Sequence, residues 1–134
     1  MIKPLVKIRI ETTDGFRSEL DAVIDPAVFY SKICLNALPK SADWIRCSGT
    51  QRRNILSGRI HDAVGWIPLV ICLEGHELDV GMIVCSSLPS PVVIGKDAIH
   101  PWGITIERKN GRIVVRVARD RNDPDVRTVL CDAA

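Results

Sequence analysis

The residue best placed for chemistry is Asp25, an acid set inside a short apolar segment. It follows Ala22-Val23-Ile24 and precedes Pro26, a residue type that cannot donate a ladder hydrogen bond and therefore ends or turns a strand. A carboxylate at the end of a strand is half sheltered from water, so its neighbours can control its hydrogen bonds and its pKa. The same position also suits a structural acid that accepts backbone N–H groups of a turn. From the residues alone, both interpretations of Asp25 stay open.

The other reactive residue types lack the spacing of a familiar site. His61, His76 and His100 do not have metal-ligand spacing, and the five cysteines contain no Cys-x-x-Cys pair of the kind that binds zinc or does thioredoxin-type chemistry. Gly95-Lys96 lacks both the first glycine and the following Ser or Thr of a phosphate-binding loop. Asp97 is either a second acid or, as we expect, an acid in the first turn of a short helix, where the helix dipole favours it. We therefore expect no metal and no cofactor.

Length and charge limit the classes of function. A chain of 134 residues predicts one domain, and 18 basic against 16 acidic residues give no reason to expect a nucleic acid or an anionic membrane as partner. Aromatic and basic residues also do not interleave as they do in nucleic-acid-binding barrels. We find no apolar run long enough to span a bilayer and no signal peptide, and an odd number of irregularly spaced cysteines fits reduced thiols. We expect a cytoplasmic (intracellular) protein.

Apolar residues at every second position predict short strands joined by tight turns. Asp14-Gly15 and Asn110-Gly111 are dipeptides typical of hairpin turns, and each is flanked by alternating apolar residues. The expected strands cover residues 5–10, 16–24, 28–30, 55–65, 66–73, 78–84, 92–94, 104–106 and 113–117. About eight short strands with many Gly and Pro turns indicate a small all-β barrel or sandwich.

Little helix is expected in this chain. Residues 31–38 predict a short helical turn capped by Ser31, and residues 96–100 predict a single helical turn stopped by Pro101. Residues 40–58 are polar, basic and rich in turn formers, which predicts an exposed loop or hairpin tip.

The order of these segments resembles that of the retropepsin family, the retroviral-type aspartic proteases and their cellular relatives. Residues 3–10 are similar to the family's opening strand, Val23-Ile24-Asp25 resembles the strand into its catalytic loop, and Ser31 stands where the family often has Ser or Thr. Residues 48–59 look like the flap, and residues 91–99 resemble the segment behind the active-site loop. The resemblance implies an all-β, retropepsin-like closed barrel with a flap hairpin and one short C-terminal helix.

The resemblance also implies an assembly and a ligand. It covers residues 3–117, so we expect a retropepsin-like domain over residues 1–118 and a charged C-terminal tail over residues 119–134. In the family a homodimer brings together two carboxylates, here Asp25 from each subunit, which share one proton and act as base and acid on water. A peptide or protein ligand then lies extended in the groove between this pair and the flap. The flap residues expected to bind it are Ser48, Gly49, Thr50, Arg52, Arg53 and Ile55.

The chain departs from the family in its active-site loop. Asp25-Pro26-Ala27 stands where the family has Asp, then Thr or Ser, then Gly. In the family the hydroxyl and N–H of the second residue interlock with the other subunit beneath the carboxylates, whereas Pro26 has neither group. Ala27 adds a Cβ where the family has a bare backbone. Two functions stay open: an aspartic endopeptidase of low or lost activity, and a catalytically inactive module kept for dimerisation or protein binding.

Overall fold

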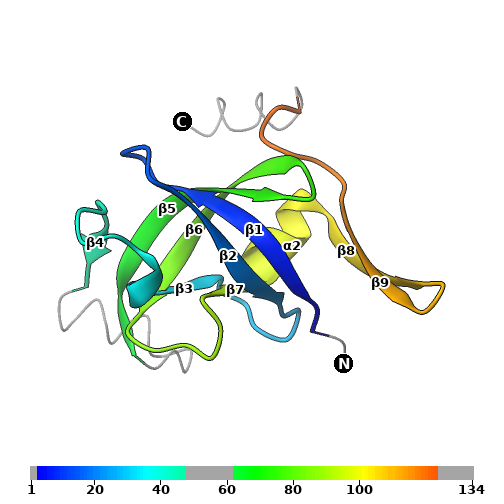
Figure 1. The fold of residues 1–134 in the computed structure, drawn as a ribbon, viewed down its shortest axis with the longest axis horizontal. Coiled ribbons are helices and arrows are strands. Elements are labelled where there is room, and N and C mark those ends of the chain that lie inside the picture. Colours follow the sequence, from blue (N-terminus) through cyan, green and yellow to red (C-terminus); the bar gives the residue numbers. More distant parts are fainter. Residues whose placement is uncertain (1–2, 48–61, 124–134) are drawn as a thin grey trace.

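The computed structural model describes residues 3–47 and 62–123 of the chain, and strands dominate it (Figure 1). In these residues, one short α-helix and one 3-10 turn interrupt the strands. The elements are β1 (Leu5–Glu11), β2 (Arg17–Ile24), β3 (Lys32–Cys34), the 3-10 turn η1 (Leu35–Ala37), β4 (Ile45–Arg46), β5 (Ala63–Leu73), β6 (His76–Cys85), β7 (Val92–Ile94), α2 (Lys96–Trp102), β8 (Ile104–Lys109) and β9 (Arg112–Val117).

Six of these strands close into a barrel. Their order is β1-β2-β7-β3-β6-β5, and β5 returns to pair with β1, which removes the open edges of the sheet. The short β4 pairs with Gly65 and Trp66 near the start of β5. β8 pairs only with β9, in a separate two-stranded sheet. Figure 1 shows that this second sheet projects away from the barrel. Within the described residues, the closed all-β barrel with one short helix confirms the fold class predicted from the sequence.

Alternating aliphatic residues fill the interior of the barrel. Along β5 every second residue is buried, beginning with Ala63 and ending with Leu73, and β6 is buried almost throughout its second half. Burying one such side chain stabilises the fold by roughly 1.5–3 kcal/mol relative to leaving it in water. The largest fully buried side chains are Ile8, Ile10, Ile24, Ile33, Ile67, Ile71, Leu73, Leu78, Met82 and Ile94.

Both hairpin turns predicted from the sequence are observed. Asn110 and Gly111 have φ angles of 51° and 75°, the left-handed pair that a two-residue hairpin turn requires. Gly15, with φ at 92°, lies in the turn between β1 and β2. The expected strand over residues 55–65 is described only from residue 62, and β5 begins at Ala63.

Two local expectations are wrong, and both errors lie in the loop between β2 and β3. Residues 28–30 are not a strand, because the backbone oxygens of Val28 and Phe29 accept hydrogen bonds from the first N–H groups of α2, those of Lys96 and Asp97. These N–H groups have no partner inside a helix. Ser31 does not cap a helical turn either, since β3 follows it and η1 covers only Leu35–Ala37.

The expected stop of the helix before Pro101 is also wrong. α2 runs through Pro101 to Trp102 and ends where Gly103 adopts a left-handed conformation, with φ at 62°. Proline costs the helix the one hydrogen bond that an N–H at residue 101 would donate, and the N–H of Gly103 closes the end of the helix by donating to the carbonyl oxygens of Ile99 and His100. In residues 3–47 and 62–123, no helix has the length and hydropathy needed to cross a membrane.

Candidate functional site

Asp25 lies where β2 leaves the barrel. β2 pairs in parallel with β7, with Ile24 opposite Ile94, and the backbone N–H of Asp25 donates to the carbonyl oxygen of Ile94 at 2.9 Å. The ladder therefore fixes the backbone of Asp25 one residue past the end of its strand. Only 8% of the residue is exposed to solvent. The sheltered strand-end position predicted for this carboxylate is the one observed.

Both carboxylate oxygens of Asp25 have a partner in the same chain. Oδ1 accepts the backbone N–H of Ala27 at 2.9 Å, and Oδ2 lies 3.3 Å from Nζ of Lys3. Lys3 was not predicted from the sequence, although the first hairpin contains the signal. Leu5 pairs with Val23 in that hairpin, so the register continued by two residues places Lys3 opposite Asp25. The arrangement holds the carboxylate between a turn and a cation.

The two residues after Asp25 have the properties expected from their types. Pro26 supplies no N–H and no hydroxyl, so it cannot make the interlock that the resemblance implies. Ala27 is exposed and its N–H is engaged by the side chain of Asp25 itself. The N–H of Val28 closes the turn by donating to the carbonyl oxygen of Asp25 at 3.3 Å. Because the side chain of Asp25 accepts the N–H two residues later, the turn is of the Asx type, as the structural interpretation of Asp25 expects.

A buried hydrogen-bond network joins the loop after Asp25 to the start of α2. Ser31 is fully buried, and its Oγ accepts the N–H of Gly95 at 3.0 Å while donating to Oδ1 of Asp97 at 2.5 Å. The N–H of Ser31 also lies 3.1 and 3.0 Å from the two carboxylate oxygens of Asp97. Asp97 occupies the first turn of α2, as predicted. Its partnership with Ser31 was not predicted, because 66 residues separate the two in the sequence.

Gly95 is a glycine because the loop passes directly over it. A Cβ at this position would lie 2.8 Å from the carbonyl oxygen of Phe29 and 2.9 Å from the carbonyl carbon of Tyr30. Any side chain would therefore push the loop away from α2 and break the hydrogen bonds that join them. The segment around Gly95 thus positions the loop that carries Asp25.

Large apolar side chains are exposed on the loop after Asp25 and on the strand that pairs with β2. Phe29 is 59% exposed and packs edge-on against Tyr30, with ring centroids 4.9 Å apart. Leu5, whose strand partner is Val23, is 64% exposed. Large apolar residues in such positions are typical of a surface that another chain covers.

The predicted flap lies outside the described residues. This holds for every residue named as a flap or substrate-binding position, namely Ser48, Gly49, Thr50, Arg52, Arg53 and Ile55. Within residues 3–47 and 62–123, no three His, Cys, Asp or Glu side chains lie close enough together to hold a metal ion.

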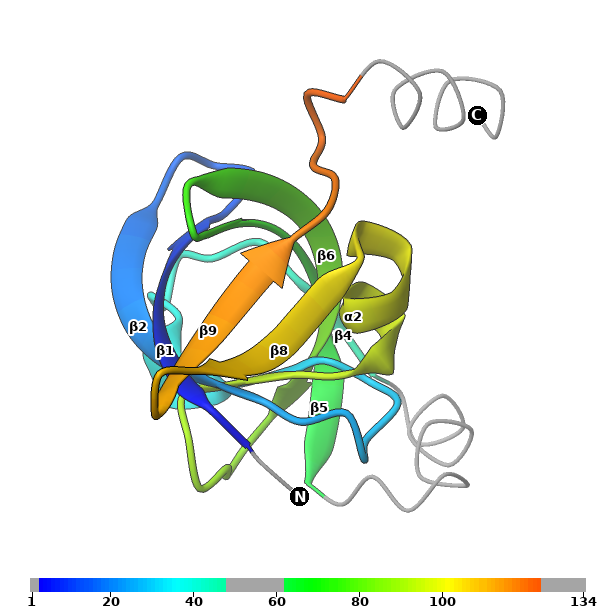
Figure 2. The same cartoon turned by 90° about the vertical axis from the view of Figure 1, so that its right-hand side faces the viewer.

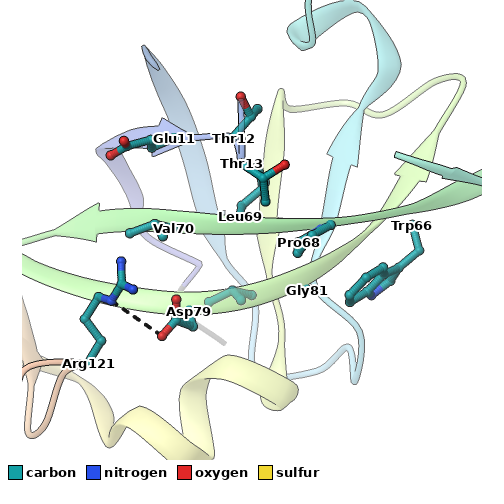
Figure 3. Close-up of a pocket in the computed structure, with 11 residues that line it drawn as sticks. Glu11, Thr12, Thr13, Trp66, Pro68, Leu69, Val70, Asp79, Gly81 and Arg121 are labelled. Carbon is teal, nitrogen blue, oxygen red and sulfur yellow. Dashed lines mark ion pairs between the residues drawn. The ribbon is translucent and has the colours of Figure 1, made fainter. Parts of the chain in front are cut away.

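Two grooves lie among the described residues, and both are away from Asp25. A groove of about 380 Å³ runs along the outside of β5 and β6, where Trp66, Pro68, Asp79 and Arg121 line it (Figure 3). A second groove, of about 440 Å³, lies between the β5–β6 turn and the β8–β9 hairpin. Asp25 and the loop after it line neither groove.

Comparisons with known proteins agree with this architecture. No protein-family model matches the sequence, and no curated protein matches it. Among solved structures, the EIAV protease complexed with the inhibitor HBY-793 matches with a TM-score of 0.50 and 18% identity, over 76% of this chain and 89% of the protease. The retroviral protease-like domain of Ddi1 from Leishmania major matches with a TM-score of 0.52 and 14% identity, over 90% of this chain and 99% of that domain. The chain therefore has the retropepsin-like fold.

Proposed function

We propose that this chain is an aspartic-type endopeptidase domain that works as a homodimer, with one Asp25 from each subunit. The observation that carries the proposal is the placement of Asp25, which the β2–β7 ladder and the Ser31–Asp97 network hold at a sheltered strand end. Two such carboxylates brought within about 3 Å cannot both ionise, so one activates water while the other supplies a proton. The single Asp25 of each subunit makes the second copy a chemical requirement of this mechanism.

Two surface features support the dimer. Phe29, on the loop after Asp25, and Leu5, the strand partner of Val23, are exposed apolar residues. The β8–β9 hairpin is buried at its base, through Ile104 and Val115, and exposed at its tip, where Ile113 is 42% exposed. Two-stranded sheets are marginally stable alone, and unpaired strand edges are ready to pair with another chain. In Figure 2 the hairpin crosses the face turned toward the viewer.

The fold neighbours support a ligand in the groove of this dimer. The EIAV protease was solved in complex with an inhibitor, and its fold is shared by this chain. We propose that an extended peptide occupies the corresponding groove here, between the Asp25 pair and the flap residues 48–59.

A second function, peptide binding without cleavage, is favoured by the chemistry around Asp25. Pro26 has no group with which to lock the two loops together beneath the carboxylates. Nζ of Lys3 also lies 3.3 Å from the carboxylate of Asp25 within the subunit, so the carboxylate already has a cationic partner. In this function the groove and the dimer are retained while the hydrolytic step is lost.

Peptide cleavage by the parent and by Asp25→Asn separates the two functions. For the endopeptidase, a peptide library is cleaved at acidic to neutral pH by the parent and at least about 100-fold more slowly by the variant, because removal of a carboxylate removes the acid–base pair. Equal turnover by both proteins contradicts the mechanism. If neither cleaves but a peptide binds both, the binding function holds.

The double substitution Pro26→Thr with Ala27→Gly restores the loop that the resemblance implies. A gain of cleavage in this variant, abolished again by adding Asp25→Asn, would show that the natural loop limits a competent carboxylate pair. An unchanged low rate would place the limitation outside residues 26 and 27. A dimer structure adds a geometric readout, since coplanar carboxylates bridged by one water support catalysis and splayed carboxylates support binding.

A further inference from the structure

The outer face of β5 is apolar, although it lies outside the barrel. Every second residue of β5 is buried in the core, and the residues between them, which point outward, are also apolar. They are Val64, Trp66, Pro68, Val70 and Cys72. A strand that is apolar on both faces is typical of one covered on both sides. In the part of the chain that the structure describes, Trp66 is nevertheless 39% exposed.

The neighbouring strand makes this face flat enough to receive another segment. Gly81 of β6 lies opposite Pro68, and a Cβ at Gly81 would come within 2.3 Å of the Trp66 ring. The indole therefore lies flat against the backbone of β6. Figure 3 shows the resulting groove, with Trp66 at one end and the ion pair of Asp79 and Arg121 toward the other.

The chain after β9 follows β6 toward this groove. Asp120 lies 2.7 Å from Nδ1 of His76, and the N–H of Arg121 donates to the carbonyl oxygen of Glu77 at 2.9 Å. The guanidinium of Arg121 then lies 3.6 Å from the carboxylate of Asp79. These contacts advance along β6 in the direction of Gly81, which lies under Trp66. The last described residue, Asp123, follows two residues later.

The sequence beyond Asp123 has the pattern of a partner for this face. Val126, Val129, Leu130 and Ala133 recur at the i, i+3, i+4 and i+7 spacing that places apolar residues on one side of a helix. Such a helix would span about 10 Å from the first to the last of these residues. The outward stripe of β5 from Trp66 to Val70 spans about 13 Å, so the two apolar surfaces match in length.

We propose that residues 124–134 dock in the groove on the outside of β5 and β6, with Val126, Val129 and Leu130 against Trp66 and Pro68. Residues 120–123, which we call the strap, lead the chain to this groove. The ion pair between Arg121 and Asp79 holds the strap at the end of the groove where residues 124–134 begin. The occupant is this chain's own C-terminal segment, because the last described contacts already lie at one end of the groove. Docking leaves Arg127 and Thr128 on the opposite, solvent-facing side of the segment.

The test is nuclear magnetic resonance of the full chain. The indole N–H of Trp66 gives one signal, which is assigned by its disappearance in Trp66→Phe. In the parent we expect nuclear Overhauser contacts between the Trp66 ring and the methyl groups of Leu130. Leu130→Asp should abolish these contacts and shift the indole signal of Trp66. Thr128→Asp introduces the same charge on the opposite side of the segment and should leave both readouts as they are in the parent.

The outcomes separate docking from its alternatives. The indole signal of Trp102, which is buried and donates to the carbonyl oxygen of Asp79, reports that each variant is folded. Contacts seen only between labelled and unlabelled molecules in a mixed sample would assign the groove to a second copy and overturn the proposal. Docking is equally overturned if Trp66 shows no contact with Leu130 in the parent, or if Thr128→Asp and Leu130→Asp act alike.

Discussion

Ser31 is the buried hydroxyl that ties the Asp25 loop to α2. Its Oγ joins the buried N–H of Gly95 to the half-buried carboxylate of Asp97, and Ser31 itself is fully buried. Ser31→Ala leaves the N–H of Gly95 without this acceptor and removes a hydrogen bond to a carboxylate, so we expect a loss of about 3 kcal/mol in the free energy of unfolding. Urea denaturation measures this loss as a lower midpoint with an unchanged slope.

Ser90→Ala is the matched control for this prediction. Within the described residues, Oγ of Ser90 is buried and has no hydrogen-bond partner. Its removal should therefore leave the midpoint unchanged or raise it slightly, because no bond is lost. Equal losses in Ser31→Ala and Ser90→Ala would contradict the view that the Ser31 network, rather than the volume of a buried side chain, holds the loop.

Cys85 is a thiol that the fold protects from reaction. Burial raises the pKa of Cys85 to about 11, an effect that nearby Lys32 only partly offsets. The thiolate is the nucleophile, and at pH 8 about one molecule in a thousand carries it. We expect iodoacetamide at pH 8 to modify the partly exposed Cys47 while leaving Cys85 unmodified until the protein is unfolded. Peptide mass mapping checks this, and modification of both cysteines at one rate would contradict it.

The strap of residues 120–123 is an element whose attachment depends on pH. A hydrogen bond from His76 holds the pKa of Asp120 below its ordinary value of 3.8. A carboxyl group with a depressed folded-state pKa stabilises the fold above its unfolded pKa, and this stabilisation is lost as the pH falls through the folded-state pKa. The His76–Asp120 contact should therefore persist at neutral pH and weaken only below about pH 4.

His76→Gln tests this cause. We expect the pKa of Asp120, followed through its side-chain carboxyl carbon by nuclear magnetic resonance, to rise toward 3.8 in the variant. His100→Gln is the control, because His100 lies in the last turn of α2 and Asp120 has no contact with it among those described. A pKa of Asp120 that stays low in His76→Gln would assign the shift to the backbone N–H groups of Asn122 and Asp123 instead.

At the scale of elements, local signals predicted local structure. Asn110-Gly111 specifies its own turn because both residues tolerate the left-handed conformation, so the β8–β9 hairpin was predictable from a few residues. The bond between Ser31 and Asp97 leaves no such local signal, because its two residues meet only when the loop before β3 contacts the start of α2. Residues 28–30 were misassigned for the same reason, since their carbonyl oxygens serve a helix that begins at Lys96.

At the scale of the whole molecule, the fold was predictable although each motif was weak. Barrel closure needs alternating apolar residues and turns in the right order, and many sequences satisfy these requirements, which agrees with 14–18% identity to structures of the same fold. The candidate site was less predictable from the sequence than the fold. The position of Asp25 followed from its strand, whereas its ion pair with Lys3 became apparent only from the hairpin register.

The assembly is the property of the whole molecule on which the proposed mechanism depends. If the β8–β9 hairpin completes a sheet with its copy, a charge at its exposed tip must be desolvated in the dimer and not in the monomer. Ile113, in the register opposite Arg108, is the largest exposed apolar residue of the hairpin. Ile113→Asp should therefore weaken the dimer at least about tenfold, equivalent to about 1.4 kcal/mol. Analytical ultracentrifugation over a concentration series measures this change.

Leu35→Asp gives the comparison that makes the result specific to the hairpin. Leu35 is also an exposed apolar residue, but it lies in η1, between β3 and β4. The same charge placed there should leave the dissociation constant of the dimer unchanged, because η1 has no role in the proposed interface. A parent chain that stays monomeric at high concentration would remove the paired carboxylates, and with them the endopeptidase. A dimer weakened equally by both substitutions would retain the pair but move the interface away from β8 and β9.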